Sequence, residues 1–192
     1  MPRMSKQDKA ISHAEIIKQG SRLFREYGIE ATSVGDIMNA SGLTHGGFYR
    51  HFSGKQDLVL ASIEFAVSEV LDQLEQVIKK QGAAVAITQY VDLYLSIQHM
   101  KKRGAGCPLA ALIEEAGRSD DAVRFCLQSA MARVVEVLAK SMSGDQGRQK
   151  ATGILAALIG SIQMARSAPS HKTATEILKS GRLVVALLLS PT

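Results

Sequence analysis

The sequence predicts an all-α protein in which three short helices precede six longer ones. Apolar residues recur at three- and four-residue intervals through most of the 192 residues. Only four prolines interrupt the chain, and few segments alternate apolar and polar residues over the length of a strand. A hydrophobic fraction of 46% with only 5% aromatic residues suits a helical core built from aliphatic side chains.

Start and stop signals divide the chain into these helices. Gly28 ends the first apolar stripe, and Thr32 and Ser33 offer hydroxyls to cap the second helix. Ser41-Gly42 makes a tight turn before the third helix. The polar residues 1–10 are expected to form a loose arm. The nine predicted helices span about 13–27, 34–40, 44–52, 55–80, 84–102, 108–117, 120–142, 146–166 and 171–189.

The segment from Thr32 to Lys55 has the build of a helix-turn-helix. Two short helices are joined by a turn, and the second carries small and hydrogen-bonding residues instead of an apolar face. Such a helix fits the major groove of DNA. Residues 1–55 also hold eight Lys and Arg against five Asp and Glu, a small excess that agrees with phosphate contact. The sequence therefore predicts a DNA-binding head.

Composition argues against several other classes of protein. Two cysteines cannot build a multi-disulfide secreted framework, and no signal peptide opens the chain. The apolar run Leu183–Leu189 is far shorter than the roughly 20 residues that cross a bilayer, so we expect a soluble, cytoplasmic protein. No Gly-x-Ser-x-Gly elbow, phosphate-binding glycine loop or metal-spaced histidine pair occurs, so no enzymatic activity, metal or cofactor is predicted.

The motifs of the head, in this order, resemble the TetR family of transcriptional regulators. The resemblance covers about 45 residues and begins with the helix from Ile16 to Tyr27, which ends in Gly28. The matching runs are Thr32-Ser33-Val34, Asp36-Ile37, Ala40-Ser41-Gly42-Leu43, Phe48-Tyr49, His51-Phe52 and Lys55. It implies a helix-turn-helix DNA-binding domain at 1–54 and a six-helix ligand-binding and dimerisation domain at 55–192. Members of the family are usually repressors that a small molecule releases from their operators.

The resemblance also implies which residues of the head contact DNA. Tyr49 would bond a phosphate through its hydroxyl, and Lys55 would meet another phosphate at the start of the fourth helix. Bases would be read from the exposed start of the third helix, and His51 would bond either within the head or to a phosphate. The predicted DNA-binding residues are Thr32, Ser33, Thr44, His45, Gly46, Gly47, Tyr49, Arg50, His51 and Lys55.

A second informative stretch surrounds Cys107. Pro108 is well placed as the first residue of a helix, which makes Cys107 its cap. A helix N-terminus and the basic run Lys101 to Arg103 both favour a thiolate. Two interpretations stay open: a sensor that oxidants or electrophiles modify, or a small buried cap residue. Cys126 is interpreted as part of the core.

A ligand cavity is expected among the fourth to eighth helices. Its apolar walls would suit a small lipophilic or electrophilic effector. The candidate lining residues are Tyr90, Leu93, Tyr94, Ile97, Cys107, Leu112, Phe125, Met131, Gln163 and Met164.

The last two predicted helices, at about 146–189, carry more apolar residues than one inner face needs. An exposed apolar face of this size predicts an interface, and the resemblance implies a homodimer on a palindromic double-stranded DNA operator. Two alternatives stay open. One is a corepressor-dependent regulator or an activator of the same architecture. The other is a nonspecific DNA-binding or interaction module without a ligand.

Overall fold

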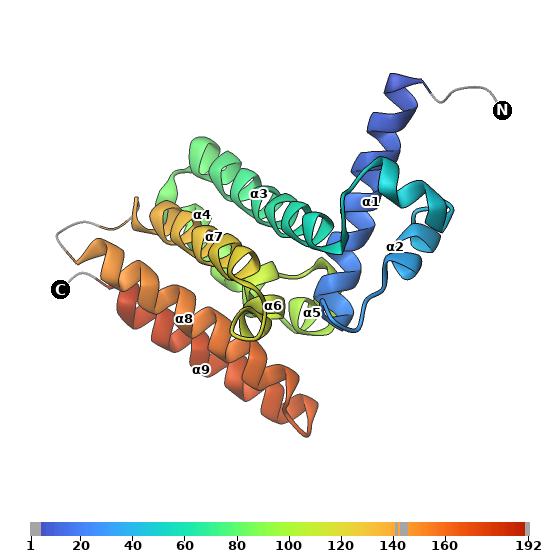
Figure 1. Cartoon of the computed structure of the whole chain (residues 1–192). Helices are drawn as coiled ribbons and strands as arrows, with labels where there is room; N and C mark the ends of the chain where they lie inside the picture. Colours follow the sequence, from blue (N-terminus) through green and yellow to red (C-terminus); the bar gives the residue numbers. More distant parts are fainter. Residues whose placement is uncertain (1–4, 141, 143–145, 191–192) are drawn as a thin grey trace.

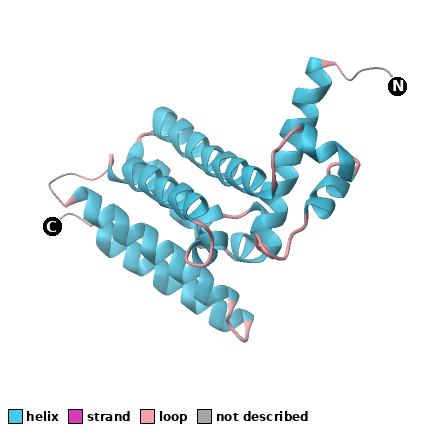
Figure 2. Ribbon diagram, in the orientation of Figure 1, coloured by secondary structure: helices cyan, strands magenta, loops and turns pink. Residues whose placement is uncertain are grey.

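The computed structural model describes residues 5–140, 142 and 146–190, and within these ranges it contains helices and no strands (Figures 1 and 2). Nine α-helices and two short 3-10 helices make up the described chain. The prediction of an all-α fold is therefore confirmed. Within the described ranges, no helix is long and apolar enough to span a membrane.

The head consists of α1 (Lys6–Tyr27), α2 (Val34–Ala40) and the 3-10 helix η1 (His45–Arg50). The expectation of a loose arm up to residue 10 is wrong, because α1 already begins at Lys6. Ser5 Oγ accepts a hydrogen bond from the Asp8 N–H at 3.0 Å, and the Asp8 carboxylate accepts one from the Ser5 N–H at 3.3 Å. This reciprocal capping box starts the helix about two turns before the predicted start at residue 13, and residues 1–4 of the predicted arm lie outside the described residues.

The predicted third helix is shorter than expected and is a 3-10 helix rather than an α-helix. It contains Gly46 and Gly47, which have low helix propensity. Phe48 is buried on its inner side and packs against the buried Phe52, with ring centroids 5.5 Å apart. This aromatic contact holds η1 on the small core of the head.

The body begins with α3 (Lys55–Gln81), which starts beside the head and packs against α1, α4 and α7 (Figure 1). Helices α8 and α9 lie side by side, with α7 between them and α3 (Figure 1). The helices after α3 are α4 (Ala83–Tyr94), α5 (Ile97–Lys101), η2 (Arg103–Ala105), α6 (Pro108–Ala116), α7 (Asp121–Ala139), α8 (Gly147–Arg166) and α9 (His171–Leu189).

The helix predicted over 84–102 is broken in two at Leu95 and Ser96. The backbone carbonyl of Leu95 accepts a hydrogen bond from the Arg182 guanidinium of α9. Ser96 Oγ then caps α5 by accepting from the His99 N–H at 3.1 Å. A side chain 87 residues away along the chain thus helps to end α4, and no local pattern could have indicated this.

Candidate functional site

The outer surface of the head carries most of the residues that the sequence assigned to DNA. Tyr49 is the most prominent of them, with 70% of its surface exposed. Gly47, His51 and Lys55 are half-buried. The exposed members of the set are Ser33, Thr44, His45, Gly46, Tyr49 and Arg50. Most of the set therefore lies where a DNA backbone or groove could reach it.

Thr32 does not belong to this surface, and its prediction as a side-chain DNA contact is wrong. The residue is only 2% exposed. Its hydroxyl donates to the Gly28 carbonyl at 2.7 Å, which ties the chain after α1 back onto that helix. It does not cap α2 either, because the cap residue is Ser33.

The Ser33 hydroxyl is exposed but already has partners. It accepts from the Asp36 N–H at 3.1 Å and donates to the Asp36 carboxylate at 2.6 Å. These bonds lower the pKa of Asp36 below its usual value, the side-chain bond from Ser33 being the larger cause. A phosphate contact by Ser33 would have to share a hydroxyl that caps α2.

His51 lies within the head. Its ring stacks on His13 of α1 with centroids 5.7 Å apart, and His13 in turn stacks on Phe52 at 4.6 Å. Burial lowers the pKa of His51, and the positive charges of His13, Lys9 and Arg50 lower it further. Its Nδ1 atom is buried without a hydrogen-bond partner, so ring stacking is the contact that His51 makes within the head, and its predicted bond to the head or to a phosphate stays a prediction.

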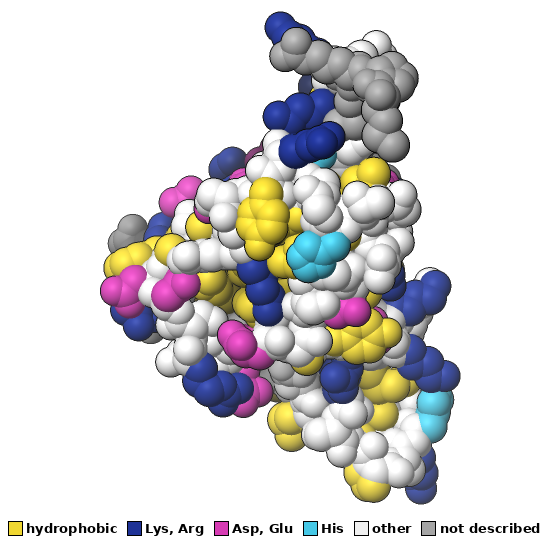
Figure 3. Space-filling model, turned by 45° about the vertical axis from the view of Figure 1, so that its right-hand side comes forward, with side chains coloured by type: hydrophobic (Ala, Val, Ile, Leu, Met, Phe, Trp, Pro, Cys, Tyr) yellow, Lys and Arg dark blue, Asp and Glu magenta, His cyan; other side chains and the backbone are white. Residues whose placement is uncertain are grey.

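Lys55 opens α3 at the edge of the head. The Asp57 carboxylate accepts hydrogen bonds from the N–H and hydroxyl of Ser53, which fixes the chain entering this helix. These bonds lower the pKa of Asp57. On the face in Figure 3, Lys and Arg side chains lie apart among uncharged ones instead of forming one dense patch. On this face, positive charge is therefore offered by separate side chains.

A cavity of about 420 Å³ lies in the body between α3, α4, α5 and the η2 segment. Of the predicted ligand residues, Tyr90, Leu93, Tyr94 and Cys107 line it. The complete lining is Val70, Gln73, Leu74, Val77, Ala86, Gln89, Tyr90, Leu93, Tyr94, Gln98, His99, Lys102, Ala105, Gly106 and Cys107.

The other six predicted pocket residues lie elsewhere. Phe125 and Met164 are about 60% exposed on the surface of α7 and α8, and Leu112 is buried in the core. Ile97 and Met131 are half-buried against the core. Gln163 donates to the backbone carbonyl of Ala110 at 2.7 Å, so it is a structural contact between α8 and α6.

Sequence patterns did not single out the α3 wall or His99 and Lys102 as pocket residues. The spacing of Val70, Leu74 and Val77 is an apolar helical stripe, which was a usable signal for an inward face. Nothing in the sequence indicated that α5 would line the same pocket as α4. This arrangement depends on the break between the two helices at Leu95.

Cys107 caps α6 and is followed by Pro108, as predicted. Its backbone N–H donates to His99 Nε2 at 3.0 Å, and His99 Nδ1 lies 2.6 Å from the Tyr94 carbonyl. A carbonyl only accepts, so Nδ1 carries the proton and Nε2 is the acceptor. Burial lowers the pKa of His99, which keeps the ring in this neutral form. Both ring nitrogens are occupied, and His99 is not available as a base for the Cys107 thiol.

The segment that carries Cys107 is bound to the head. Arg25 of α1 donates to the Gly106 carbonyl at 2.8 Å, and Glu26 accepts from the Gly104 N–H at 2.6 Å. Gly106 is packed closely, because a Cβ there would lie 2.7 Å from His99 Nε2. The pocket wall and α1 are thus joined by direct polar contacts.

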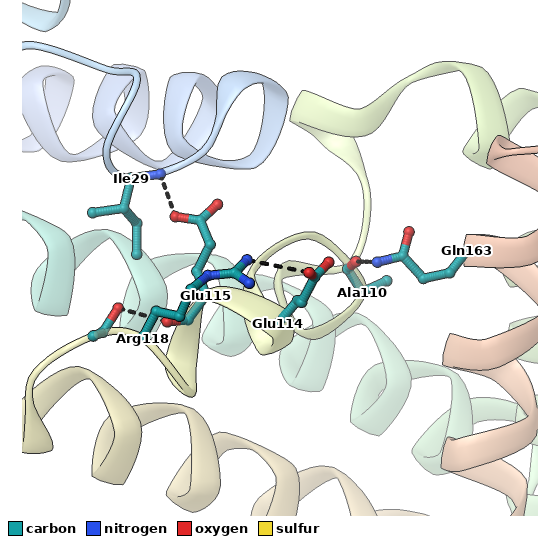
Figure 4. A network of polar contacts seen from close by, with 7 residues as sticks. Ile29, Ala110, Glu114, Glu115, Arg118 and Gln163 are labelled. Atoms are coloured by element: carbon teal, nitrogen blue, oxygen red, sulfur yellow. Dashed lines mark hydrogen bonds and ion pairs between the residues drawn. The ribbon is translucent and has the colours of Figure 1, made fainter.

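Helix α6 makes a second connection between head and body (Figure 4). The Glu115 carboxylate accepts from the Ile29 N–H of the head at 2.8 Å, while Gln163 of α8 holds the Ala110 carbonyl. Neighbouring Glu114 instead pairs with Arg118 at 3.1 Å on the exposed side. A movement of α6 would therefore displace Ile29 and the loop between α1 and α2.

Comparison with known proteins places the head in a recognised group. Residues 16–62 match the family model described as bacterial regulatory proteins, tetR family. The chain is 30% identical over 91 residues to YfiR, an uncharacterized HTH-type transcriptional regulator of Bacillus subtilis; the match covers 47% of this chain and 44% of YfiR. It is 25% identical over 162 residues to Rv0196, an uncharacterized HTH-type regulator of Mycobacterium tuberculosis, covering 79% and 82% of the two chains.

The fold of the whole chain has a counterpart among solved structures. The regulatory protein TetR from Rhodobacter sphaeroides superposes with a TM-score of 0.78 at 19% identity, over 94% of this chain and 100% of that one. The similarity in fold therefore extends through the body, although the family model covers only residues 16–62, which end within the first part of α3.

Proposed function

This chain belongs to the TetR family of transcriptional regulators, and from that premise we propose that it is a repressor that binds a palindromic operator as a homodimer. A small lipophilic or electrophilic effector, or modification of Cys107, releases it from DNA. The observation that carries the proposal is the exposed helix-turn-helix surface within the segment that matches the family model. The domains meet at residues 54 and 55, with DNA binding before that point and effector binding and dimerisation after it.

In this proposal the DNA contacts divide by type. The Tyr49 hydroxyl and Lys55 bind phosphates, which position the head without reading sequence. Thr44, His45 and Arg50 face the major groove and read base edges. Gly46 and Gly47 let η1 approach closely, and part of the specificity comes from backbone contacts and DNA shape.

The homodimer forms through α8 and α9. Met164, Leu183, Val184 and Leu187 of these helices are exposed apolar side chains, although the two helices already pack on one another. At Gly160 of α8, a Cβ would meet nothing within 4 Å, so a second copy could approach there closely. These features favour a four-helix contact between two copies.

Release from DNA follows from the contacts between pocket and head. A ligand in the cavity presses on the wall formed by residues 105–107, and Arg25 and Glu26 pass that movement to α1. Tilting of α3 then changes the distance between the two heads of the dimer. By thermodynamic reciprocity, DNA binding weakens effector binding by the same factor.

The proposal is tested by selecting bound sequences from a random pool of DNA at near-physiological salt with the reduced protein. Recovery of an inverted repeat supports a dimeric, sequence-specific regulator. Recovery only in the presence of added small molecules would indicate the corepressor-dependent alternative. Salt-sensitive binding without any recovered motif would favour the nonspecific module and contradict the proposal.

Cys107 modification is tested separately on the recovered operator. Treatment with peroxide, a quinone and an aldehyde is expected to weaken DNA binding of the wild type, whereas Cys107→Ser is expected to keep its affinity. An equal response of both proteins would contradict a sensing role and leave Cys107 as a cap residue.

A further inference from the structure

Two hydroxyl groups in the pocket wall are buried without hydrogen-bond partners. Tyr94 is 3% exposed, and neither its oxygen nor that of Tyr90 has a partner among the described residues. The two rings lie one turn apart on α4 with centroids 5.6 Å apart, so both belong to the same wall. The Cys107 side chain acts on both phenols and is a hydrogen-bonding neighbour of Tyr94, but a thiol is a weak hydrogen-bonding group and leaves the need for a stronger partner. Unpaired buried hydroxyls are rare in folded proteins and call for a partner.

Both phenols keep a proton that they can donate, and because their oxygens are buried a ligand reaches them only when the pocket wall shifts. Burial is the main cause that raises the pKa of each phenol well above its usual value, and the neighbouring Cys107 raises it further. Each hydroxyl therefore keeps its proton. The nearby His99 offers no free acceptor, because Nε2 already accepts from the Cys107 N–H. Three glutamine amides of the lining can donate or accept.

The charges around this wall are predominantly positive. Lys102 is the only charged side chain in the lining, and the lining contains no carboxylate. Behind the wall, the Arg25 and Arg166 guanidiniums interact with Cys107, and Arg166 also interacts with Tyr94. Arg166 Nη2 is itself buried without a hydrogen-bond partner.

Two carboxylates offset these charges in part. Glu69 acts on Arg25, and Glu26 acts on Arg166 while also accepting from Gly104. Arg103, which acts on Arg166 as well, adds a further positive charge. The balance at the pocket remains in favour of an anion.

We infer that the effector is an apolar monocarboxylic acid. Its carboxylate accepts hydrogen bonds from the Tyr90 and Tyr94 hydroxyls near Lys102, and its body lies against the apolar side chains of α3. The inference rests on the proposed function, since it names the ligand class of the same pocket. The 420 Å³ cavity accommodates an acid of about ten to fifteen non-hydrogen atoms.

The test is direct binding by calorimetry to the full-length protein without DNA. Two matched series are used: octanoate, octanol and octylamine, and 4-phenylbutyrate, 4-phenylbutanol and 4-phenylbutylamine. At least one acid is expected to bind roughly tenfold or more tightly than its matched alcohol and amine. The inference is overturned if neither acid binds, or if the alcohol or amine of each series binds as tightly as the acid.

Variants identify the groups responsible. The double variant Tyr90→Phe with Tyr94→Phe keeps both rings and is expected to lose about tenfold in affinity for the acid and little for the alcohol. It is also expected to fold at least as stably as the wild type, because it removes two unpaired hydroxyls. Lys102→Gln is expected to lower the affinity for the acid. It is also expected to make that affinity less dependent on salt concentration. Lys101→Gln, which lies outside the lining, is the matched control. Unchanged acid affinity in the double variant overturns the inference.

The same acids are then added to the protein bound to its operator. If they bind with the expected preference but leave operator affinity unchanged, the ligand class stands and the proposed release mechanism fails. If a neutral or electrophilic compound releases the operator while no acid binds, the release mechanism stands and the ligand class fails.

Discussion

At the level of single residues, two exposed tyrosines on the head offer a matched test of DNA contact. Tyr49 lies in η1, and Tyr27 ends α1 with 64% of its surface exposed. If the Tyr49 hydroxyl binds a phosphate, Tyr49→Phe should weaken operator binding roughly five- to tenfold, about equally for different DNA sequences. Tyr27→Phe should leave affinity unchanged. Titration of labelled operator DNA measures both, and equal behaviour of the two variants would argue against the contact.

The Glu115 carboxylate is a residue-scale link between body and head. Glu115→Ala leaves the Ile29 N–H without its partner and should destabilise the protein by roughly 1–3 kcal/mol. In a chain of this size that lowers Tm by a few degrees. Glu114→Ala removes only an exposed ion pair and should cost less than about 1 kcal/mol. Thermal unfolding at one fixed protein concentration compares them; a larger loss in Glu114→Ala would contradict the importance of the α6 link.

His99 gives the stability of the body a pH dependence of known sign. Its pKa in the folded protein lies below the ordinary value of 6.5, chiefly because it is buried, so protonation favours the unfolded chain. Its contribution is therefore complete above about pH 6.5 and declines as the pH falls toward the folded pKa. His99→Gln should show a smaller drop in Tm between pH 7.5 and 5.5 than the wild type.

His51, whose pKa is also lowered, should leave part of that pH dependence in place in His99→Gln. His171→Gln, at the exposed start of α9, is the control and should keep the wild-type drop. If His99→Gln loses as much stability in acid as the wild type, the buried neutral imidazole does not contribute to it.

At the level of elements, local signals determined most helix ends. Gly28 and Gly82 adopt positive φ at the ends of α1 and α3, and Pro108 opens α6, as the sequence indicated. The early start of α1 could also have been predicted, because Ser5 and Asp8 have the spacing of a capping box. The break after α4 could not, since it involves Arg182 of the last helix.

One glycine of η1 and one of the turn between α2 and η1 allow a paired prediction. At Gly46 a Cβ meets nothing within 4 Å and φ is not positive, so Gly46→Ala should stabilise the protein by about 0.4–1 kcal/mol. Gly42 has φ of 70°, so Gly42→Ala should destabilise it by roughly 1–2 kcal/mol. Thermal unfolding of both variants checks the signs; stabilisation by Gly42→Ala would be inconsistent with this turn.

At the level of the whole molecule, the head was easier to predict than the pocket. The residues predicted to contact DNA follow one another in a short segment whose order is itself informative, and of these only Thr32 is buried. Pocket residues come from four separate segments, and helical spacing gives a helix an inner face without saying which neighbour it meets. Tyr90 and Tyr94 were found because they lie one turn apart, whereas Phe125 and Met164 have equally apolar side chains but point outward.

The proposed dimer would connect these parts, and it can be tested at α9. Leu183 and Leu187 are 64% and 68% exposed and lie four residues apart on one face. Leu183→Glu combined with Leu187→Glu should place charge in the contact between copies and give a monomer by light scattering at micromolar concentration. Phe125→Glu, on the exposed side of α7, should remain a dimer.

Operator binding should fall with the loss of the dimer, because two linked heads bind an inverted repeat with a high effective concentration for the second contact. The α9 double variant should therefore bind the full repeat at least about tenfold more weakly than Phe125→Glu, while the two proteins bind an isolated half-site alike. A double variant that stays dimeric would place the interface elsewhere. A monomer that binds the full repeat as tightly as the wild type would show that each head binds DNA independently. An effector could then not release DNA by changing the distance between the two heads.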